Sequence, residues 1–398
     1  MNLFSLVLVG LGRNKRRTIL TFLSVTVALF LFSALGGVLD TLEDSIKVGS
    51  ETRLITRNAV SLVLALPPAY RERIAAVPGV EAVSYANWFG ALDPNDRNGY
   101  FAQFAIDADT YLPIYRDEFE IVESSEPQAP VSLPADFPPG LEAFMAEQTA
   151  CVIGRTLMEK KGWKLGQTIT LAGTIFPGDW PFTIRAVYRA KQKSFGEESM
   201  LFHWEYLNQK GMGGNGAIGW YLMALSEPGI AADVSKRIDA TYENSAAPTR
   251  TETEKAFQAG FVSMYGNLPF VIRVIGLAVV FAILLVAANT MVMSFRERTT
   301  EFGVLKTLGF ADATIFGIVL AEAAIITLGG GLAGTLLAKF ALESSGFNFG
   351  GFLPPMTIYW TTVVLGVGMA LLVGAVSGLV PAWQAARLDI VDALRRVD

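Results

Sequence analysis

The chain has 398 residues, of which 52% are hydrophobic and 17% are charged, and its formal net charge at pH 7 is −5. This composition is more apolar than that of an ordinary soluble domain and favours a membrane protein. The single cysteine excludes an intrachain disulfide. No G-x-x-x-x-G-K-S/T phosphate loop occurs, so we expect the chain itself to bind no ATP, and we expect no metal or other cofactor.

Four stretches are long and apolar enough to cross a bilayer as helices, since one span needs about 20 such residues. They are residues 18–39, 270–294, 313–340 and 358–380. The first and the last carry no charge, which disfavours the alternative of buried helices in a soluble core. Residues 1–17 form an amphipathic segment before the first span. We interpret that span as an uncleaved anchor, because it is longer than the apolar part of a signal peptide.

Basic residues predict the orientation of the spans, because lysine and arginine concentrate in cytoplasmic loops. They occur before the first span, in residues 295–312 between the second and third spans, and in the tail 381–398. They are Arg13, Lys15, Arg16, Arg17, Arg296, Arg298, Lys306, Arg387, Arg395 and Arg396. We therefore expect both termini and residues 295–312 in the cytoplasm, and residues 40–269 and the loop 341–357 on the other side.

Residues 40–269 predict an α+β domain inserted between the first two spans of an α-helical membrane protein. Period-two alternation and turn residues mark its strands and loops. Strands are expected at 79–85, 101–107, 167–171 and 182–188, helices at 67–78 and 231–242, loops at 126–140 and 211–216, and a strand running into a helix at 151–162. Residues 39–48 and 251–265 are expected to continue the spans as a helical stalk.

This domain shows no catalytic constellation. Cys151 lies on an apolar strand and is expected to be a core residue rather than a reactive thiol. His203 is the only histidine, so a catalytic triad or a histidine metal cluster would lack companions. A membrane-anchored enzyme is therefore the least favoured reading, and we expect that the protein is not an enzyme.

The charged run from Arg296 to Gly309 separates the second and third spans. We expect it to form a short helix that a soluble partner grips at the membrane surface, with Glu301 and Lys306 as charged handles. Its apolar residues are Phe302, Val304, Leu305 and Leu308. The alternative is an amphipathic helix that only lies on the lipid surface.

Two glycines frame this helix. Gly303 would permit close approach of another chain, and Gly309 would end the helix before Asp312 caps the next one.

Small residues four apart recur in the last two spans. Gly330 and Gly334 lie in the third span, and Gly374 and Gly378 in the fourth. This spacing favours close helix packing within one subunit and between copies. Glu322 is costly in lipid and is expected to face protein, in a structural pairing rather than a proton relay.

Several segments, in order along nearly the whole chain, resemble FtsX-like, MacB-type ABC transporter permeases. The run from Arg298 to Gly309 is similar to the segment after their second span, and the tail from Pro381 to Arg395 is similar to their ending. Residues 74–84, 152–157, 164–171 and 182–187 are similar to parts of the MacB-like periplasmic core domain.

The resemblance implies a permease without its own ATPase, in a bacterial inner membrane, that pairs with a second copy or a paralogue. ATP and magnesium would be bound by a separate cytoplasmic ATPase, which would hold the segment 295–312 as a coupling helix. The positions it implies for this coupling are Arg298, Glu301, Gly303, Lys306 and Gly309. Leu305 and Phe310 depart from the family pattern, which leaves the identity of that ATPase open.

Export or extraction of a lipid, lipoprotein, peptide or hydrophobic small molecule is the expected function, with a periplasmic adaptor as a further partner. The alternative is an FtsX-like mechanotransmitter that activates an extracytoplasmic enzyme without transport. The sequence leaves open the substrate, the direction of its movement and the identity of the second permease subunit.

Overall fold

The computed structural model describes residues 3–47, 50–96, 101–127, 130–191, 196–263, 266–345 and 356–389. It consists of two compact units. The helix unit comprises Met1–Thr41, Asn267–Phe347 and Pro355–Asp398, and the sheet unit comprises Leu42–Gly266 and Asn348–Pro354. The predicted class is confirmed: four helices are long and apolar enough to span a membrane, and an α+β domain lies between the first two along the chain.

Among the described residues, the helix unit has four long helices and two short ones. In chain order they are α1 (Leu3–Arg13), α2 (Lys15–Lys47), α10 (Leu268–Glu297), α11 (Thr299–Thr307), α12 (Asp312–Ser344) and α13 (Trp360–Ala386). Helix α13 packs against both α10 and α12. It begins at Trp360 rather than at residue 358, and it continues through the buried Pro381 beyond the expected end of the span. The part of the tail beyond residue 389 and the loop residues 346–355 lie outside the described residues.

Helix α11 ends as its sequence predicts. Gly309 has a φ of +89°, a left-handed conformation that glycine adopts without strain. The amide of Phe310 bonds the carbonyl of Leu305, and the amide of Gly309 bonds that of Lys306. The expected cap of the next helix is wrong, however. Asp312 is the first residue of α12, the capping position is occupied by Ala311, and no side chain bonds there.

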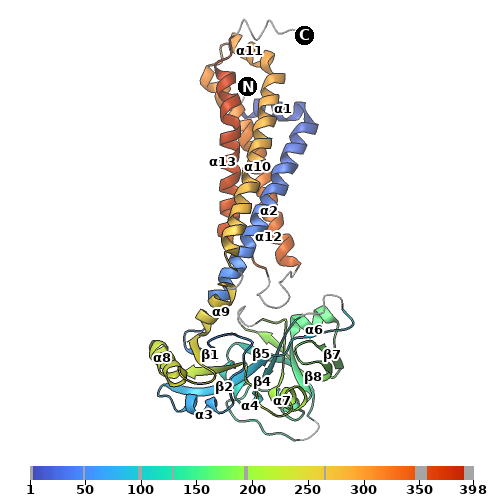
Figure 1. The fold of residues 1–398 in the computed structure, drawn as a ribbon. Helices are drawn as coiled ribbons and strands as arrows, with labels where there is room; N and C mark the ends of the chain where they lie inside the picture. Colours follow the sequence, from blue (N-terminus) through green and yellow to red (C-terminus); the bar gives the residue numbers. More distant parts are fainter. Residues whose placement is uncertain are drawn as a thin grey trace. The chain divides into compact units, whose positions relative to one another are not determined.

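The sheet unit contains one mixed sheet (Figure 1). Its strands are ordered β11-β1-β10-β2-β4-β9-β6-β8-β7-β3, with β5 paired to β8. The strands are β1 (Arg53–Asn58), β2 (Val80–Trp88), β3 (Ala91–Leu92), β4 (Ala102–Ile106), β5 (Phe119–Ser124), β6 (Ala150–Gly154), β7 (Thr168–Gly173), β8 (Gly178–Ala190), β9 (Ser199–His203), β10 (Trp220–Leu225) and β11 (Thr249–Thr253). The pairs β4–β9 and β6–β8 are parallel, and the other pairs are antiparallel.

Helices cover both faces of this sheet. They are α3 (Tyr70–Ala75), α4 (Ala108–Ile114), α5 (Glu142–Met145), α6 (Arg155–Lys161), α7 (Trp204–Gly211), α8 (Ala231–Tyr242) and α9 (Glu254–Ser263). Successive side chains of the central strands belong to two different apolar clusters, because neighbouring side chains of a strand point to opposite faces of the sheet. Thus Met200 and Phe202 lie in one cluster and Leu201 in the other.

The structure corrects two of the helix predictions in this unit. Residues 251–253 belong to strand β11, so the predicted stalk helix begins only at Glu254, and its residues 264–265 lie outside the described part. The expected helix 67–78 is shorter, because α3 covers only Tyr70–Ala75.

Cys151 and His203 both lie in the interior of this unit. Cys151 is fully buried, and this burial raises the pKa of its thiol. The imidazole of His203 stacks on Phe144 and its Nε2 lies 2.8 Å from the carbonyl oxygen of that residue, while burial lowers the pKa of His203. Both residues therefore have structural environments.

Candidate functional site

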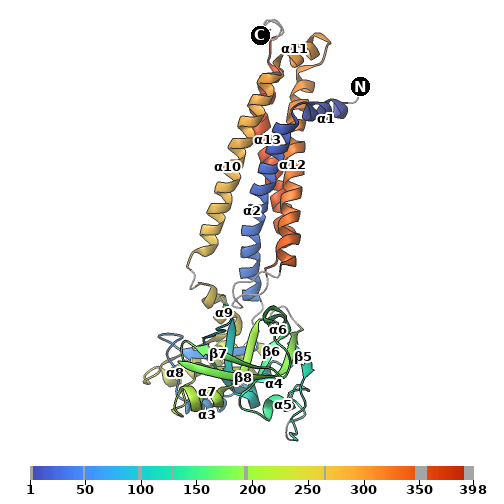
Figure 2. The same cartoon turned by 90° about the vertical axis from the view of Figure 1, so that its right-hand side faces the viewer.

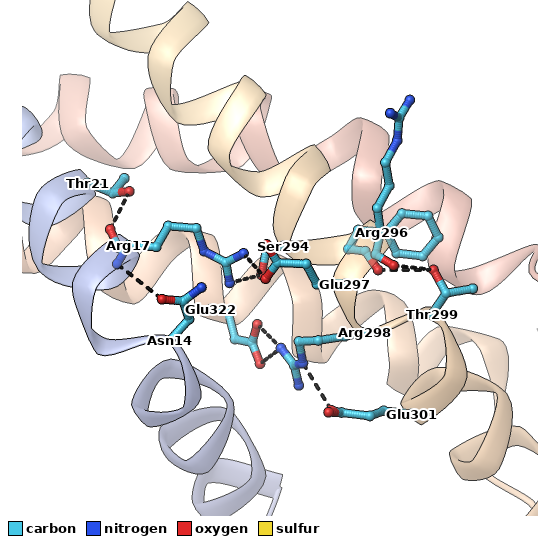
Figure 3. A network of polar contacts seen from close by, with 11 residues as sticks. Asn14, Arg17, Thr21, Ser294, Arg296, Glu297, Arg298, Thr299, Glu301 and Glu322 are labelled. Carbon is cyan, nitrogen blue, oxygen red and sulfur yellow. Dashed lines mark hydrogen bonds and ion pairs between the residues drawn. The ribbon is translucent and has the colours of Figure 1, made fainter. Parts of the chain in front are cut away.

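The turn between α10 and α11 is held by a buried ion pair. Nη1 of Arg298 lies 2.8 Å and 2.6 Å from the two carboxylate oxygens of Glu322 in α12 (Figure 3). The two side chains are only 12% and 7% exposed. The Arg298 guanidinium also lies over the ring of Phe302, 5.0 Å from its centroid. Arg298 thus fixes the start of α11 to α12 rather than pointing to solvent.

The other end of α11 is fixed by Lys306. Its ammonium donates to the carbonyl oxygens of Ala386 and Leu388 at 2.6 and 2.9 Å, just where α13 ends, and it pairs with Asp312 at 2.9 Å. A lysine at this place satisfies carbonyls that the helix terminus leaves free. The side chain is 11% exposed, so the expectation of a free charged handle at Lys306 is wrong.

Between these two anchors, the inner face of α11 packs on the bundle. Phe302 is 1% exposed and lies in a cluster with Ile315, Ala382 and Ala385, and Gly303 is buried too. Glu301 accepts from Nε of Arg298 at 3.1 Å and pairs with Arg13 of α1.

The outer face of α11 is apolar. Val304 is 44% exposed and Leu308 is 70% exposed. The exposed hydroxyl residues Thr300 and Thr307 flank them at helical spacing. The surface of α11 available to a partner is therefore a pair of aliphatic side chains with hydroxyl neighbours, whereas its charged residues Glu301 and Lys306 make contacts within the chain.

All four predicted packing glycines lie at contacts between helices of the same chain. A Cβ on Gly330 or Gly334 would lie 2.9 Å or 2.3 Å from a carbonyl oxygen of α2. A Cβ on Gly374 or Gly378 would lie 2.2 Å or 2.9 Å from a side-chain atom of α12. These glycines therefore bring α2, α12 and α13 together within one subunit.

Changing Gly334 to alanine is expected to destabilise the helix unit by about 1–3 kcal/mol, because the added methyl forces α2 and α12 apart at backbone atoms. Alanine favours a helix over glycine, so the loss cannot come from helix propensity. The measurement is thermal unfolding of the full chain in lipid nanodiscs. Gly317 of α12 has no atom within 4 Å of an added Cβ, so Gly317→Ala is the control and should unfold like the wild type or later.

A second buried charge cluster lies in the sheet unit, where β1 and α9 begin. Arg53 of β1 pairs with Glu254 at 2.7 Å and with Glu118, and all three side chains are at most 14% exposed. The hydroxyl of Tyr115 donates to Glu254 at 2.8 Å, and the Arg53 guanidinium lies 4.5 Å from the centre of that ring. Burial raises the pKa of Glu118, although Arg53 opposes this shift. The cluster ties the first residue of α9 to the sheet.

Comparison with known proteins matches both parts of the chain. The model of the MacB-like periplasmic core domain matches residues 18–241, and the model of the FtsX-like permease C-terminal region matches residues 273–390. The chain belongs to the family of MacB/FtsX-like ABC transporter permeases. It is accordingly a multi-pass membrane protein with an extracytoplasmic domain.

Relatives in this family differ in how much of their length the chain covers. The uncharacterized ABC transporter permease YknZ of Bacillus subtilis is 36% identical over 114 residues, which are 27% of this chain and 26% of that protein. The macrolide export ATP-binding/permease protein MacB of Vibrio parahaemolyticus is 29% identical over 239 residues, 56% of this chain and 34% of that protein. The uncharacterized ABC transporter permease MJ1507 of Methanocaldococcus jannaschii is 22% identical over 414 residues, 97% of this chain and 96% of that protein.

Solved structures of family members resemble the chain over about half its length. The periplasmic region of MacB from Actinobacillus actinomycetemcomitans is 8% identical, with a TM-score of 0.36, and the match covers 55% of this chain and 97% of that one. The extracellular domain of YknZ is 13% identical with a TM-score of 0.35, and the match covers 50% and 98%.

The sequence did not reveal which residues contact α10 and α11 in the bundle. Arg13 and Arg17 entered the sequence analysis only as part of a basic flank, and Gly10 did not enter it. In the structure Arg17 donates to Glu297 at 2.7 Å and to Ser294 at 2.8 Å (Figure 3). The only sequence signal for these contacts is the excess of basic residues before the first span opposite the acidic residues of the charged run.

Proposed function

We propose that this chain is the permease subunit of a MacB-type ABC transporter and that α11 is its coupling helix. A separate ATPase, which binds the ATP and magnesium, docks on α11 at the cytoplasmic face of a bacterial inner membrane. Both termini lie on that side and the sheet unit lies in the periplasm. A second copy or a paralogue completes the membrane part. The cargo is a lipid, a lipoprotein, a peptide or a hydrophobic small molecule.

The observation that carries this proposal is the double attachment of α11. Arg298 ties its first turn to α12, Lys306 ties its last turn to α13, and α10 continues directly into it. A force applied to the outer face is therefore delivered to three spans together. A helix that only floats on lipid needs no such attachment to the bundle.

The interior of the bundle favours transmission of movement over a water-filled path. In the described part of α12, the hydroxyls of Thr327 and Thr335 donate to carbonyls one turn earlier, at 3.0 and 2.9 Å. Glu322, the buried carboxylate of that helix, is neutralised by Arg298. Glu322 also lines a small pocket with Arg17 and Ser294, and the volume of that pocket, about 10 Å³, is room for about one water molecule and not for a substrate. Hydrolysis would then act through the movement of whole helices on the extracytoplasmic domain.

Replacing both aliphatic residues of the outer face, as Val304→Glu with Leu308→Glu, is expected to weaken ATPase binding by about 30- to 1000-fold, because one hot-spot residue of an interface contributes about 2 kcal/mol and two contribute up to about 4 kcal/mol. The measurement is the affinity of the cognate ATPase, obtained by co-purification with the wild-type chain, for each variant in nanodiscs.

The matched control is Val304→Ile with Leu308→Met, which keeps the surface apolar and should bind like the wild type. Equal affinity of the acidic variant and the control would refute docking on this face. Failure of the wild-type chain to bind any ATPase would overturn the proposed function as a whole. If ATP hydrolysis moves the extracytoplasmic domain but no cargo, the mechanotransmitter is favoured over the exporter.

A further inference from the structure

Helix α1 lies outside what the family match and the proposed function explain. The matched region begins at residue 18, whereas α1 covers Leu3–Arg13. A short break follows at Asn14, and α2 starts at Lys15. Within the helix unit, α1 runs across the end of α2 and packs against α12 (Figure 2). Its position is that of an interfacial helix that is held by the protein and not only by lipid.

The contact that seats α1 is made by a glycine over the buried ion pair. A Cβ added to Gly10 would lie 2.2 Å from Oε1 of Glu322 and 3.0 Å from both terminal nitrogens of Arg298. The backbone of α1 therefore covers the Arg298–Glu322 pair, and a side chain at residue 10 would have to displace the charged ends of Glu322 and Arg298. Gly12, one half-turn further along the same helix, is exposed and has no atom within 4 Å of its added Cβ.

A second contact connects α1 directly to α11. Arg13 forms an ion pair with Glu301, whose other oxygen accepts from Nε of Arg298. Glu301 thus lies between an arginine of α1 and the arginine that anchors α11 to α12 (Figure 3 shows Glu301, Arg298 and Glu322). One connected network of charged side chains therefore joins α1, α11 and α12.

We propose that α1 is a clamp of the coupling assembly: by covering the Arg298–Glu322 pair and holding Glu301, it locks α11 to α12, and its displacement releases α11. This inference rests on the proposed function, because it describes how that same coupling helix is held.

The physical basis is the dependence of an ion pair on its surroundings. A pair shielded from water attracts strongly, whereas the same pair exposed to water contributes little. The side chains of Arg298 and Glu322 owe part of their low exposure to α1. Lifting α1 would hydrate the pair and allow α11 to move without α12. Since the outer residues Val304 and Leu308 do not take part, the ATPase would still bind, but its movement of α11 would no longer carry α12 along.

The test uses Gly10→Ala with Gly12→Ala as its matched control. Both changes raise helix propensity equally, but only the first places a methyl on the ion pair. We expect amide hydrogen exchange in residues 299–307 of the permease alone to become on the order of tenfold faster in Gly10→Ala. We also expect ATP hydrolysis coupled to cargo movement to fall on the order of tenfold, with unchanged affinity for the ATPase. Gly12→Ala should match the wild type in all three measurements.

A charge reversal checks the second contact independently. Arg13→Glu should accelerate the hydrogen exchange of α11 amides about two- to threefold, since the pair is partly exposed. Arg13→Lys keeps a cation beside Glu301 and leaves the bond between Arg298 and Glu301 intact, so it should keep the wild-type rate. Wild-type exchange and coupling in Gly10→Ala, or equal exchange rates in Arg13→Glu and Arg13→Lys, would overturn the clamp. The exchange measurement needs no ATPase, so it separates failure of the clamp from failure of the proposed function.

Discussion

Removing Arg298 as Arg298→Met is expected to destabilise the helix unit by about 3–5 kcal/mol, the loss typical of a buried ion pair that loses one partner. The change leaves the carboxylate of Glu322, 7% exposed, without its bidentate partner in an apolar helix. The double variant Arg298→Met with Glu322→Met should recover most of this stability, because an apolar pair carries no desolvation penalty. Thermal unfolding in nanodiscs measures both.

The same variants separate stability from coupling. Neither variant retains a bond between α11 and α12 at this point, so in both the ATP-driven movement of α12 should weaken even where the double variant is stable. Arg296→Met is the matched control, since the Arg296 side chain is exposed and makes no polar contact among the described residues (Figure 3). If Arg298→Met unfolds like the wild type, the pair contributes nothing to the stability of the helix unit.

The second large effect is expected at the start of α9. Arg53→Met leaves Glu118 and Glu254 buried beside each other without a cation. We expect a loss of about 3–5 kcal/mol in the stability of the sheet unit at neutral pH. The pKa of Glu118 is already raised by burial in the wild type, and removing the arginine raises it further.

The sign of the pH dependence follows from this shift. A carboxyl whose pKa is higher in the folded than in the unfolded state binds its proton more tightly when folded. The stability of the fold therefore rises as the pH falls through the pKa of that carboxyl in the folded state. The loss in Arg53→Met should therefore be largest near pH 8 and shrink towards pH 5, as measured by unfolding of the full chain.

The control is Arg250→Met, which removes a 61% exposed arginine of β11 and should cost at most about 1 kcal/mol. A loss in Arg53→Met that stays constant between pH 5 and pH 8 would contradict the assignment of buried, unpaired carboxylates.

The sequence determined the elements whose signal is local. Four apolar runs of span length predicted α2, α10, α12 and α13, since crossing lipid needs a number of apolar residues that can be counted. The glycine at position 309 ended α11 because its backbone conformation is a property of that residue. Helix α8 occupies the predicted residues 231–242, where apolar residues recur with helical spacing.

Several strands of the sheet could not be predicted from the local sequence pattern. The predictions omitted β1, β3, β5, β9, β10 and β11, and β11 took residues expected to be helical. Strand β1 is held between β10 and β11, whose residues lie far from it in the chain. Such pairing is decided by partners that a local pattern does not contain.

At the candidate site the sequence identified the segment, and the tertiary structure decided what its residues do. The charged run predicted a helix with exposed handles, and instead Arg298 bonds Glu322 of α12, Lys306 bonds carbonyls at the end of α13, and Glu301 bonds Arg13 of α1. Spacing along one helix tells which residues share a face, but not which face meets the rest of the bundle. Only the packing of α1, α12 and α13 around α11 turned its charges inward and left Val304 and Leu308 for a partner.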